Sequence, residues 1–196
     1  MIVFFAVNLV KGGVIVADVY KFKVKLRELE NYIWRDIEVT SVSTVAKLGY
    51  AILAAFEADG SHLFCVKFGD ERYEIVFDDI YEDFDLEVID PTIVKLSSLK
   101  LKSGDLLSLE YDYGAGWVFD IEFLSNEPLK KGTGTHYPYI TDGMGWGIIE
   151  DACPEELLHQ IKTNEIRKFD LETSNYLLKG MVQRIQESYE DFEEWD

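Results

Sequence analysis

The order of secondary-structure signals along this chain predicts an α+β fold, with a β-grasp (ubiquitin-like) type mixed sheet and one packed helix. Helical spacing over residues 43–56 places apolar side chains on one face, which is typical of a helix that covers a sheet. Alternating apolar and polar residues indicate the strands. The expected strands are residues 20–27, 33–39, 62–68, 72–77, 107–111 and 117–121.

The later elements are expected to extend the β-grasp core. Ser43 is a plausible N-cap for the packed helix, which should end near Asp59-Gly60. The last two strands form a hairpin, and the glycines and prolines that follow indicate a long irregular loop over residues 124–149. Pro154 suits the first position of a helix, and a final helix is expected from about Ser174.

The length and composition agree with a single domain over residues 1–196. Hydrophobic residues make up 47% of the chain, and its formal net charge is −18. Residues 1–18 are apolar but are interrupted by Asn8 and Lys11. We therefore expect an extra N-terminal strand or hairpin there, rather than a signal peptide or a membrane span. The acidic residues 187–196 are expected to fray.

The cysteines point to a reducing compartment. Cys65 and Cys153 are too few for a disulfide scaffold and lack a zinc-binding pattern. We expect reduced thiols, a cytoplasmic location and no cofactor.

The first strand carries the only concentrated positive charge. Its basic residues, here called the basic stripe, are Lys21, Lys23, Lys25 and Arg27. They could contact nucleic acid, which keeps a nucleic-acid accessory protein as a second alternative function. The net negative charge opposes phosphate binding, however, because that affinity depends on basic side chains releasing counterions. We expect the stripe to pair with the acidic residues 78–90 instead.

The most distinctive segment is a hairpin at residues 111–121, whose strands alternate apolar residues on either side of a glycine turn. Gly114 and Gly116 flank one small residue and permit positive φ at the tip. The segment resembles the YDFGDxWxHxI signature of the plasmid pRiA4b ORF-3-like family, whose members occur on plasmids and as passengers of transposable elements.

Further segments resemble this family in the same order, from about Tyr20 to Leu178. They are Ile33-Trp34-Arg35, His62-Leu63 with Phe68 and Tyr73, Leu101 with Gly104-Asp105, Glu150-Asp151, and Phe169-Asp170-Leu171-Glu172 with Asn175 and Leu178. The resemblance implies a protein associated with mobile genetic elements, in a family whose biochemical function is uncharacterised.

This chain departs from the family pattern at polar positions of the hairpin. Ala115 stands where the family usually has Asp, and Phe119 stands where it usually has His. Ala152-Cys153 replaces the paired glycines that commonly follow the Glu-Asp turn. We therefore predict a non-catalytic binding or interaction module for an unknown protein or small-molecule partner, with no membrane association.

The residues that could carry chemistry are His62, Asp112, Asp142, Glu150 and Asp151. An imidazole with several carboxylates could hold a divalent metal, so a metal-dependent hydrolase using the histidine, Asp112, Glu150 and Asp151 is the alternative function. Their spacing along the sequence does not by itself define a metal or catalytic site. Aspartates beside glycines are typical turn residues, and Glu150-Asp151 is well placed to cap the next helix. We therefore predict no metal site and no catalytic residue.

Aromatic side chains supply the candidates for binding a ligand or partner. These are Tyr113, Trp117, Tyr137 and Trp146. Aromatic anchors dominate many binding sites, but an aromatic-rich hairpin is more often part of a core. Trp146, which lies among glycines, is the one we most expect to be exposed.

Overall fold

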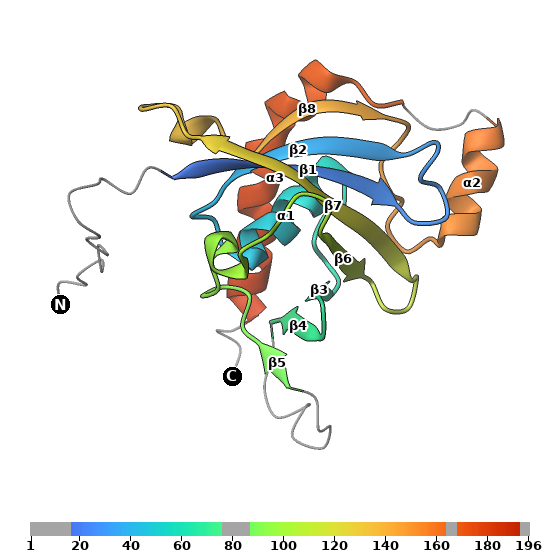
Figure 1. Ribbon diagram of the computed structural model, residues 1–196. Helices are drawn as coiled ribbons and strands as arrows, with labels where there is room; N and C mark the ends of the chain where they lie inside the picture. The colour runs from blue at the N-terminus through green and yellow to red at the C-terminus, as the bar shows by residue number, and fades with distance from the viewer. Residues whose placement is uncertain (1–16, 76–86, 164–167, 193–196) are drawn as a thin grey trace, which may run out of the picture.

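The computed structural model describes residues 17–75, 87–163 and 168–192, and within them the fold is α+β. A mixed sheet of eight strands carries helices on one face (Figure 1). The strands are β1 Asp18–Leu26, β2 Trp34–Thr40, β3 Phe64–Phe68, β4 Glu71–Glu74, β5 Val88–Ile89, β6 Leu106–Tyr111, β7 Trp117–Pro128 and β8 Tyr139–Met144. The helices are α1 Val45–Ala55, α2 Pro154–Thr163 and α3 Leu171–Phe192, with 3-10 turns η2 Leu96–Leu99 and η3 Gly134–His136.

The strand order is β5-β4-β3-β6-β7-β1-β2-β8. Every neighbouring pair is antiparallel except β4 and β5. The predicted α+β class is confirmed, but the β-grasp topology is not. The β6–β7 hairpin lies in the middle of the sheet, between β3 and β1, rather than as an extension at its side.

The predicted irregular loop at 124–149 is partly regular structure. β7 continues to Pro128, and β8 pairs with β2 at the edge of the sheet. In β8 only Ile140 is buried, so its sequence lacks the apolar alternation that reveals a strand. The Asn175 side chain of α3 closes this edge, because its Oδ1 accepts from Ile140 N at 2.9 Å and its Nδ2 donates to Ile140 O at 2.8 Å.

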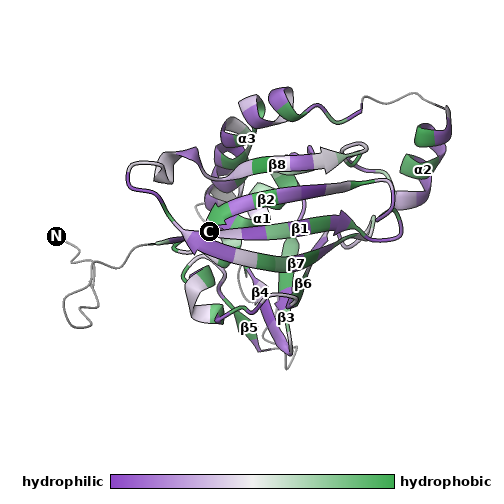
Figure 2. Cartoon of the chain, turned by 45° about the horizontal axis from the view of Figure 1, so that its top comes forward, coloured by the Kyte–Doolittle hydropathy of each residue, from purple (hydrophilic) through white to green (hydrophobic). Residues whose placement is uncertain are grey.

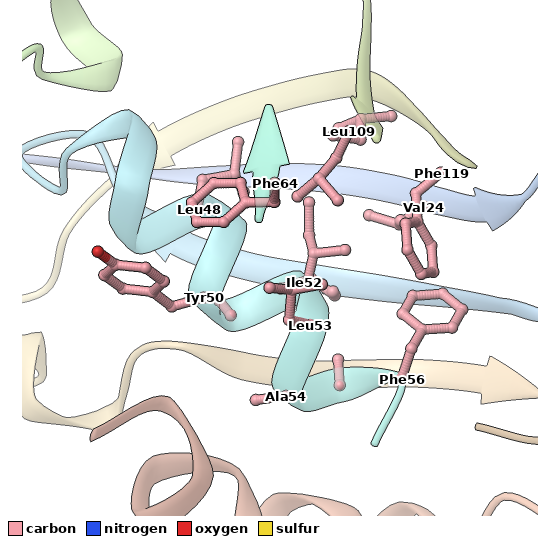
Figure 3. Close-up of a cluster of buried hydrophobic side chains, with 14 of the residues drawn as sticks. Val24, Leu48, Tyr50, Ile52, Leu53, Ala54, Phe56, Phe64, Leu109 and Phe119 are labelled. Atoms are coloured by element: carbon pink, nitrogen blue, oxygen red, sulfur yellow. The ribbon is translucent and has the colours of Figure 1, made fainter. Parts of the chain in front are cut away.

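The core lies between the sheet and α1, with α3 packed behind α1 (Figures 1 and 3). In Figure 3, Leu48 and Ile52 of α1, and Phe56 just after the helix, lie toward side chains of the sheet such as Leu109 and Phe119. The helix begins after Thr44, not Ser43, because Thr44 Oγ1 accepts from Lys47 N at 3.2 Å.

The other face of the sheet is polar, and Figure 2 shows apolar and polar residues alternating along the central strands. The basic stripe lies on this polar face, and its Lys21, Lys23 and Arg27 form ion pairs with carboxylates of β2 and β7. Lys23 lies 2.8 Å from Asp36 of β2, and Lys21 lies 2.8 Å from Glu127 of β7. The expected partner was residues 78–90, and most of that stretch lies outside the described residues.

Both ends of the chain are described only in part. Residues 1–16, which carry most of the expected N-terminal strand or hairpin, and residues 193–196 lie outside the described ranges. Residues 187–192, which we expected to fray, belong to α3. Among the helices in the described ranges, none combines the length and apolar character needed to cross a membrane.

Candidate functional site

Four of the five predicted polar candidates lie together at one end of the sheet. His62 follows α1 and precedes β3, Asp112 begins the turn between β6 and β7, and Glu150 and Asp151 lie between β8 and α2. His62 Nε2 lies 3.6 Å from Asp112 Oδ2, 4.0 Å from Glu150 Oε2 and 3.5 Å from Asp151 Oδ1. These four residues form what we call the His62 cluster. When the imidazole is protonated, each of these contacts is an ion pair.

Asp112 is held by its own turn. It adopts φ 49°, and its Oδ1 accepts hydrogen bonds from Gly114 N and Ala115 N, both at 3.1 Å. The predicted turn chemistry of Asp112 is therefore confirmed, and it leaves Oδ2 facing His62. The second left-handed position is Gly116, with φ 77°, whereas Gly114 does not adopt positive φ. The expectation that both glycines supply positive φ at the tip is wrong for Gly114, and the other positive-φ residue of the turn is Asp112.

Glu150 joins three segments of the chain. Its Oε1 accepts from Asp59 N at 2.7 Å, both of its oxygens accept from the Tyr111 hydroxyl at 3.2 and 3.1 Å, and Oε2 also faces His62. Burial raises the pKa of the Glu150 carboxyl, and the hydrogen bond from Asp59 N opposes that shift. The Tyr111 ring, fully buried, also meets the His62 ring edge-on, with centroids 5.8 Å apart. Glu150 therefore ties the end of α1 and the end of β6 to the loop that precedes α2.

Asp151 is the most open member of the cluster, with its side chain 88% exposed. We expected Glu150-Asp151 to cap α2, and this expectation is wrong. The residue before the first helical position is Cys153, and its backbone N–H donates to Glu156 Oε2 at 3.3 Å. A glutamate three positions into the helix satisfies that donor, which leaves the Asp151 carboxylate free to face His62.

Asp142 does not join the cluster. It lies on β8 opposite Asp36 of β2, and its Oδ1 accepts from Gly143 N at 2.8 Å. Within residues 17–75, 87–163 and 168–192, no group of three or more His, Cys, Asp and Glu side chains is arranged to hold a metal ion.

The aromatic candidates are dispersed. Trp117 is fully buried in the core and also borders a pocket beside Asp112 and Tyr113, and its role as a ligand contact stays a prediction. Trp146 is half-buried rather than exposed, with Lys168 Nζ 5.9 Å from its ring centroid. Tyr113 is 46% exposed and donates its hydroxyl hydrogen to the buried Glu74. Tyr137 lines a groove beside the last residue of β7, Pro128, at the opposite end of this strand from the His62 cluster.

Arg35 is the residue whose role our sequence reasoning missed. It lies on β2, is fully buried, and contacts the rings of Phe56 and Phe169, whose centroids lie 4.9 and 4.1 Å from its guanidinium carbon. The guanidinium donates to the carbonyls of Trp34, Ala55, Met144 and Trp146. Burial lowers the pKa of Arg35 to about 10, so the side chain remains charged at neutral pH.

Arg35 joins the end of α1 to the segment that leads to Glu150. Its Nε donates to Ala55 O at 3.2 Å, and its Nη1 donates to Met144 O at 2.6 Å. The signal was present in the sequence. Ile33, Arg35 and Ile37 share one face of an alternating strand, and that face is buried.

A family model described as plasmid pRiA4b ORF-3-like protein matches residues 18–165. The chain belongs to this family. A search among curated proteins finds no match. A similar solved structure is that of the protein of unknown function MM3350 from Methanosarcina mazei Go1, with a TM-score of 0.65 and 20% sequence identity. That similarity covers 85% of this chain and 88% of the other, and at this identity it shows the fold alone.

The matched region of this pRiA4b ORF-3-like chain contains the whole His62 cluster and Arg35. Phe169 and Asn175 lie beyond its end. The family and the structural neighbour both lack an assigned biochemical role, so the function must be argued from the site itself.

Proposed function

We propose that this protein is a non-catalytic binding module, and that the His62 cluster contacts a positively charged group of its ligand or partner. The observation that carries this proposal is the convergence of three carboxylates on His62 Nε2, at 3.5 to 4.0 Å. The cluster is open to solvent at Asp151 and at His62, whose side chain is 32% exposed. A net charge of −18 attracts a cationic partner further.

The carboxylates suit recognition of an ammonium or guanidinium group. Asp112 uses Oδ1 for its turn and presents Oδ2 toward His62, and both oxygens of Glu150 are held by hydrogen bonds while Oε2 also faces His62. Their positions are therefore fixed before a ligand arrives, which reduces the entropy lost on binding. Hydrogen bonds from a cationic donor to ionised oxygens are among the stronger polar contacts in proteins.

The hairpin supports binding rather than catalysis. Phe119, which stands where the family usually has His, is fully buried, and its ring centroid lies 4.8 Å from that of Phe56. Ala115, which stands where the family usually has Asp, packs against the core. Any chemistry that depends on polar side chains at these two positions is not supported in this chain.

The proposal also includes an association with mobile genetic elements, a cytoplasmic location and no direct binding of nucleic acid. Family membership supports an association with plasmids or other mobile genetic elements. The free thiols of Cys65 and Cys153 support a cytoplasmic location. The pairing of the basic stripe with carboxylates of β2 and β7 supports a protein that does not bind nucleic acid directly.

The proposal is tested by titrating the protein with arginine amide and lysine amide, followed by two-dimensional ¹H–¹⁵N NMR. We expect saturable shifts confined to residues 59–63, 111–116 and 148–152, at a Kd of about 1 mM or tighter, as suits a single charged group. Asp151→Asn should weaken binding, and Asp70→Asn in the exposed β3–β4 turn should not. If neither amide produces saturable shifts at the cluster, the proposed site is wrong.

A metal-dependent hydrolase is the second candidate, prompted by the same convergence, although no group of three or more His, Cys, Asp and Glu side chains in the described residues is arranged to hold a metal ion. Asp112 and Glu150 already hold hydrogen bonds that would orient them as ligands. This candidate requires that a divalent ion binds to the cluster and that the loaded protein hydrolyses an ester or phosphate bond. Metal binding that depends on both His62 and Glu150 would favour it over the binding module.

A further inference from the structure

We infer a second binding site, for a small planar aromatic ligand that carries one anionic group, in a groove at the opposite end of β7 from the His62 cluster. The groove has a volume of about 570 Å³ and lies where β7 ends and the chain turns through η3 into β8. This volume lies within the range of small-molecule sites. The twelve residues of β7 separate the two sites by roughly 35 Å.

A candidate aromatic contact and one end of the basic stripe meet in this groove. Tyr137, a candidate ligand contact, and Lys21, the first residue of the basic stripe, both line it. The Tyr137 hydroxyl has a raised pKa, first through burial and then through the Glu38 carboxylate. This places the phenol beside the polar end of the groove.

Two lysines and two carboxylates line the groove, and the position of the exposed Lys130 is what suits an anionic ligand. The two carboxylates are both taken by Lys21, whose Nζ lies 3.5 Å from Glu38 Oε1 and 2.8 Å from Glu127 Oε1. Lys130 also lines the groove, is exposed, and forms no ion pair with any residue of the described ranges. His136 lies on the same rim. Lys130, at the exposed rim, therefore remains available as a cationic donor, while Lys21 holds the two carboxylates.

The remaining lining suits a flat ring. Tyr139 is 42% exposed and, like Tyr137, contributes an aromatic side chain, while Val19 and Pro128 contribute apolar surface. Aromatic side chains stack on planar ligands whatever the ligand's exact composition. A nucleoside monophosphate and an aryl carboxylate share the chemistry of a ring with one anionic group.

The test is an NMR titration of the full chain with four probes: AMP, 4-hydroxyphenylacetate, adenosine and inorganic phosphate. We expect saturable shifts at residues 128–139 with AMP, with 4-hydroxyphenylacetate, or with both, and the stronger probe identifies the source of the ligand. Adenosine and phosphate alone should bind at least about tenfold more weakly, because each supplies only half of the recognition.

Variants separate this groove from the rest of the surface. Lys130→Ala and Tyr137→Ala should each weaken binding of the stronger probe by about fivefold or more. The matched controls Lys131→Ala, next to the groove, and Tyr176→Ala, on an 86% exposed side chain of α3, should not. His62→Ala should also leave it unchanged, which keeps this result independent of the proposed function. The inference is overturned if neither aromatic anion saturates, or if binding survives both groove variants unchanged.

Discussion

The guanidinium of Arg35 lies against the ring of Phe169, with its central carbon 4.1 Å from the ring centroid. Phe169 reaches this position from just before α3, and its backbone N–H donates to Gly145 O, the residue after β8. Gly143 must lack a side chain here, because a Cβ would lie 2.7 Å from Arg35 Cδ and 2.9 Å from Phe169 Cε1. The buried cation thus fixes β8, the segment that follows it, and the start of α3 around β2.

Arg35→Lys should therefore destabilise the protein by about 2–4 kcal/mol. An ammonium cannot reproduce the fork of donors that reaches four carbonyls, so some of these acceptors would lose their partner. Urea unfolding measures the loss, with Arg184→Lys on the exposed side of α3 as the matched control. A loss for Arg35→Lys no larger than that of the control would refute this role.

Gly116→Ala should destabilise the protein by about 1–2 kcal/mol, because Gly116 adopts φ 77° and a Cβ resists the left-handed region. The matched control is Gly180→Ala in α3, where an added Cβ would meet open space. This substitution should raise the stability by about 0.5–1 kcal/mol, because alanine has the higher helix propensity. Equilibrium denaturation of both variants checks the prediction. Changes of the same sign at the two positions would contradict it.

Asn175→Ala should destabilise the protein by about 1–3 kcal/mol, because it removes the side chain that bonds both backbone groups of Ile140. It should also uncover an edge strand, so light scattering should show more self-association with rising concentration. Ser174→Ala, at the neighbouring position, is the control. Unchanged stability and unchanged scattering would mean that the edge does not depend on Asn175.

Glu150 should make stability fall as pH rises. A carboxyl whose pKa is raised on folding binds its proton more tightly in the folded state. Its contribution to the free energy of unfolding is therefore fully present below the unfolded pKa of about 4.3, and it is lost as pH rises through the folded pKa. Glu150→Gln removes this titration but keeps an oxygen for Asp59 N. The stability of the native protein minus that of Glu150→Gln should thus decrease with pH above about 4.3. A difference that stays constant or increases would show that the carboxyl is not destabilised by burial.

The sequence predicted the strands whose apolar and polar residues alternate clearly. It did not predict a strand with a single buried side chain, or the position of a strand that depends on pairing with strands far away in the sequence. The hairpin of β6 and β7 was predicted because each inward residue is apolar, down to the fully buried Trp117 and Phe119. β8 was missed because it is an edge strand with one buried side chain. The position of the hairpin within the sheet depends on long-range pairing with β1 and β3, which local periodicity does not encode.

The candidate site was predicted in its residues but not in its geometry. His62, Asp112, Glu150 and Asp151 were identified by residue type, and the structure brings them together. Their convergence follows from three connections between elements, which no spacing in the sequence specifies. The capping role expected of Glu150-Asp151 failed because Glu150 bonds Asp59 N and the Tyr111 hydroxyl, and Asp151 faces His62.

The central claim, a non-catalytic binding module, is tested most directly by the melting temperature in millimolar Mg²⁺, Mn²⁺ or Zn²⁺. An ion bound by the native state alone at a hundred times its Kd would add about 2.7 kcal/mol and shift melting by several degrees. Our account predicts shifts below about 2 °C, from generic screening of the acidic surface. It would be contradicted by a larger shift with one ion that is lost in His62→Ala and in Glu150→Gln but kept in the exposed control Glu172→Gln.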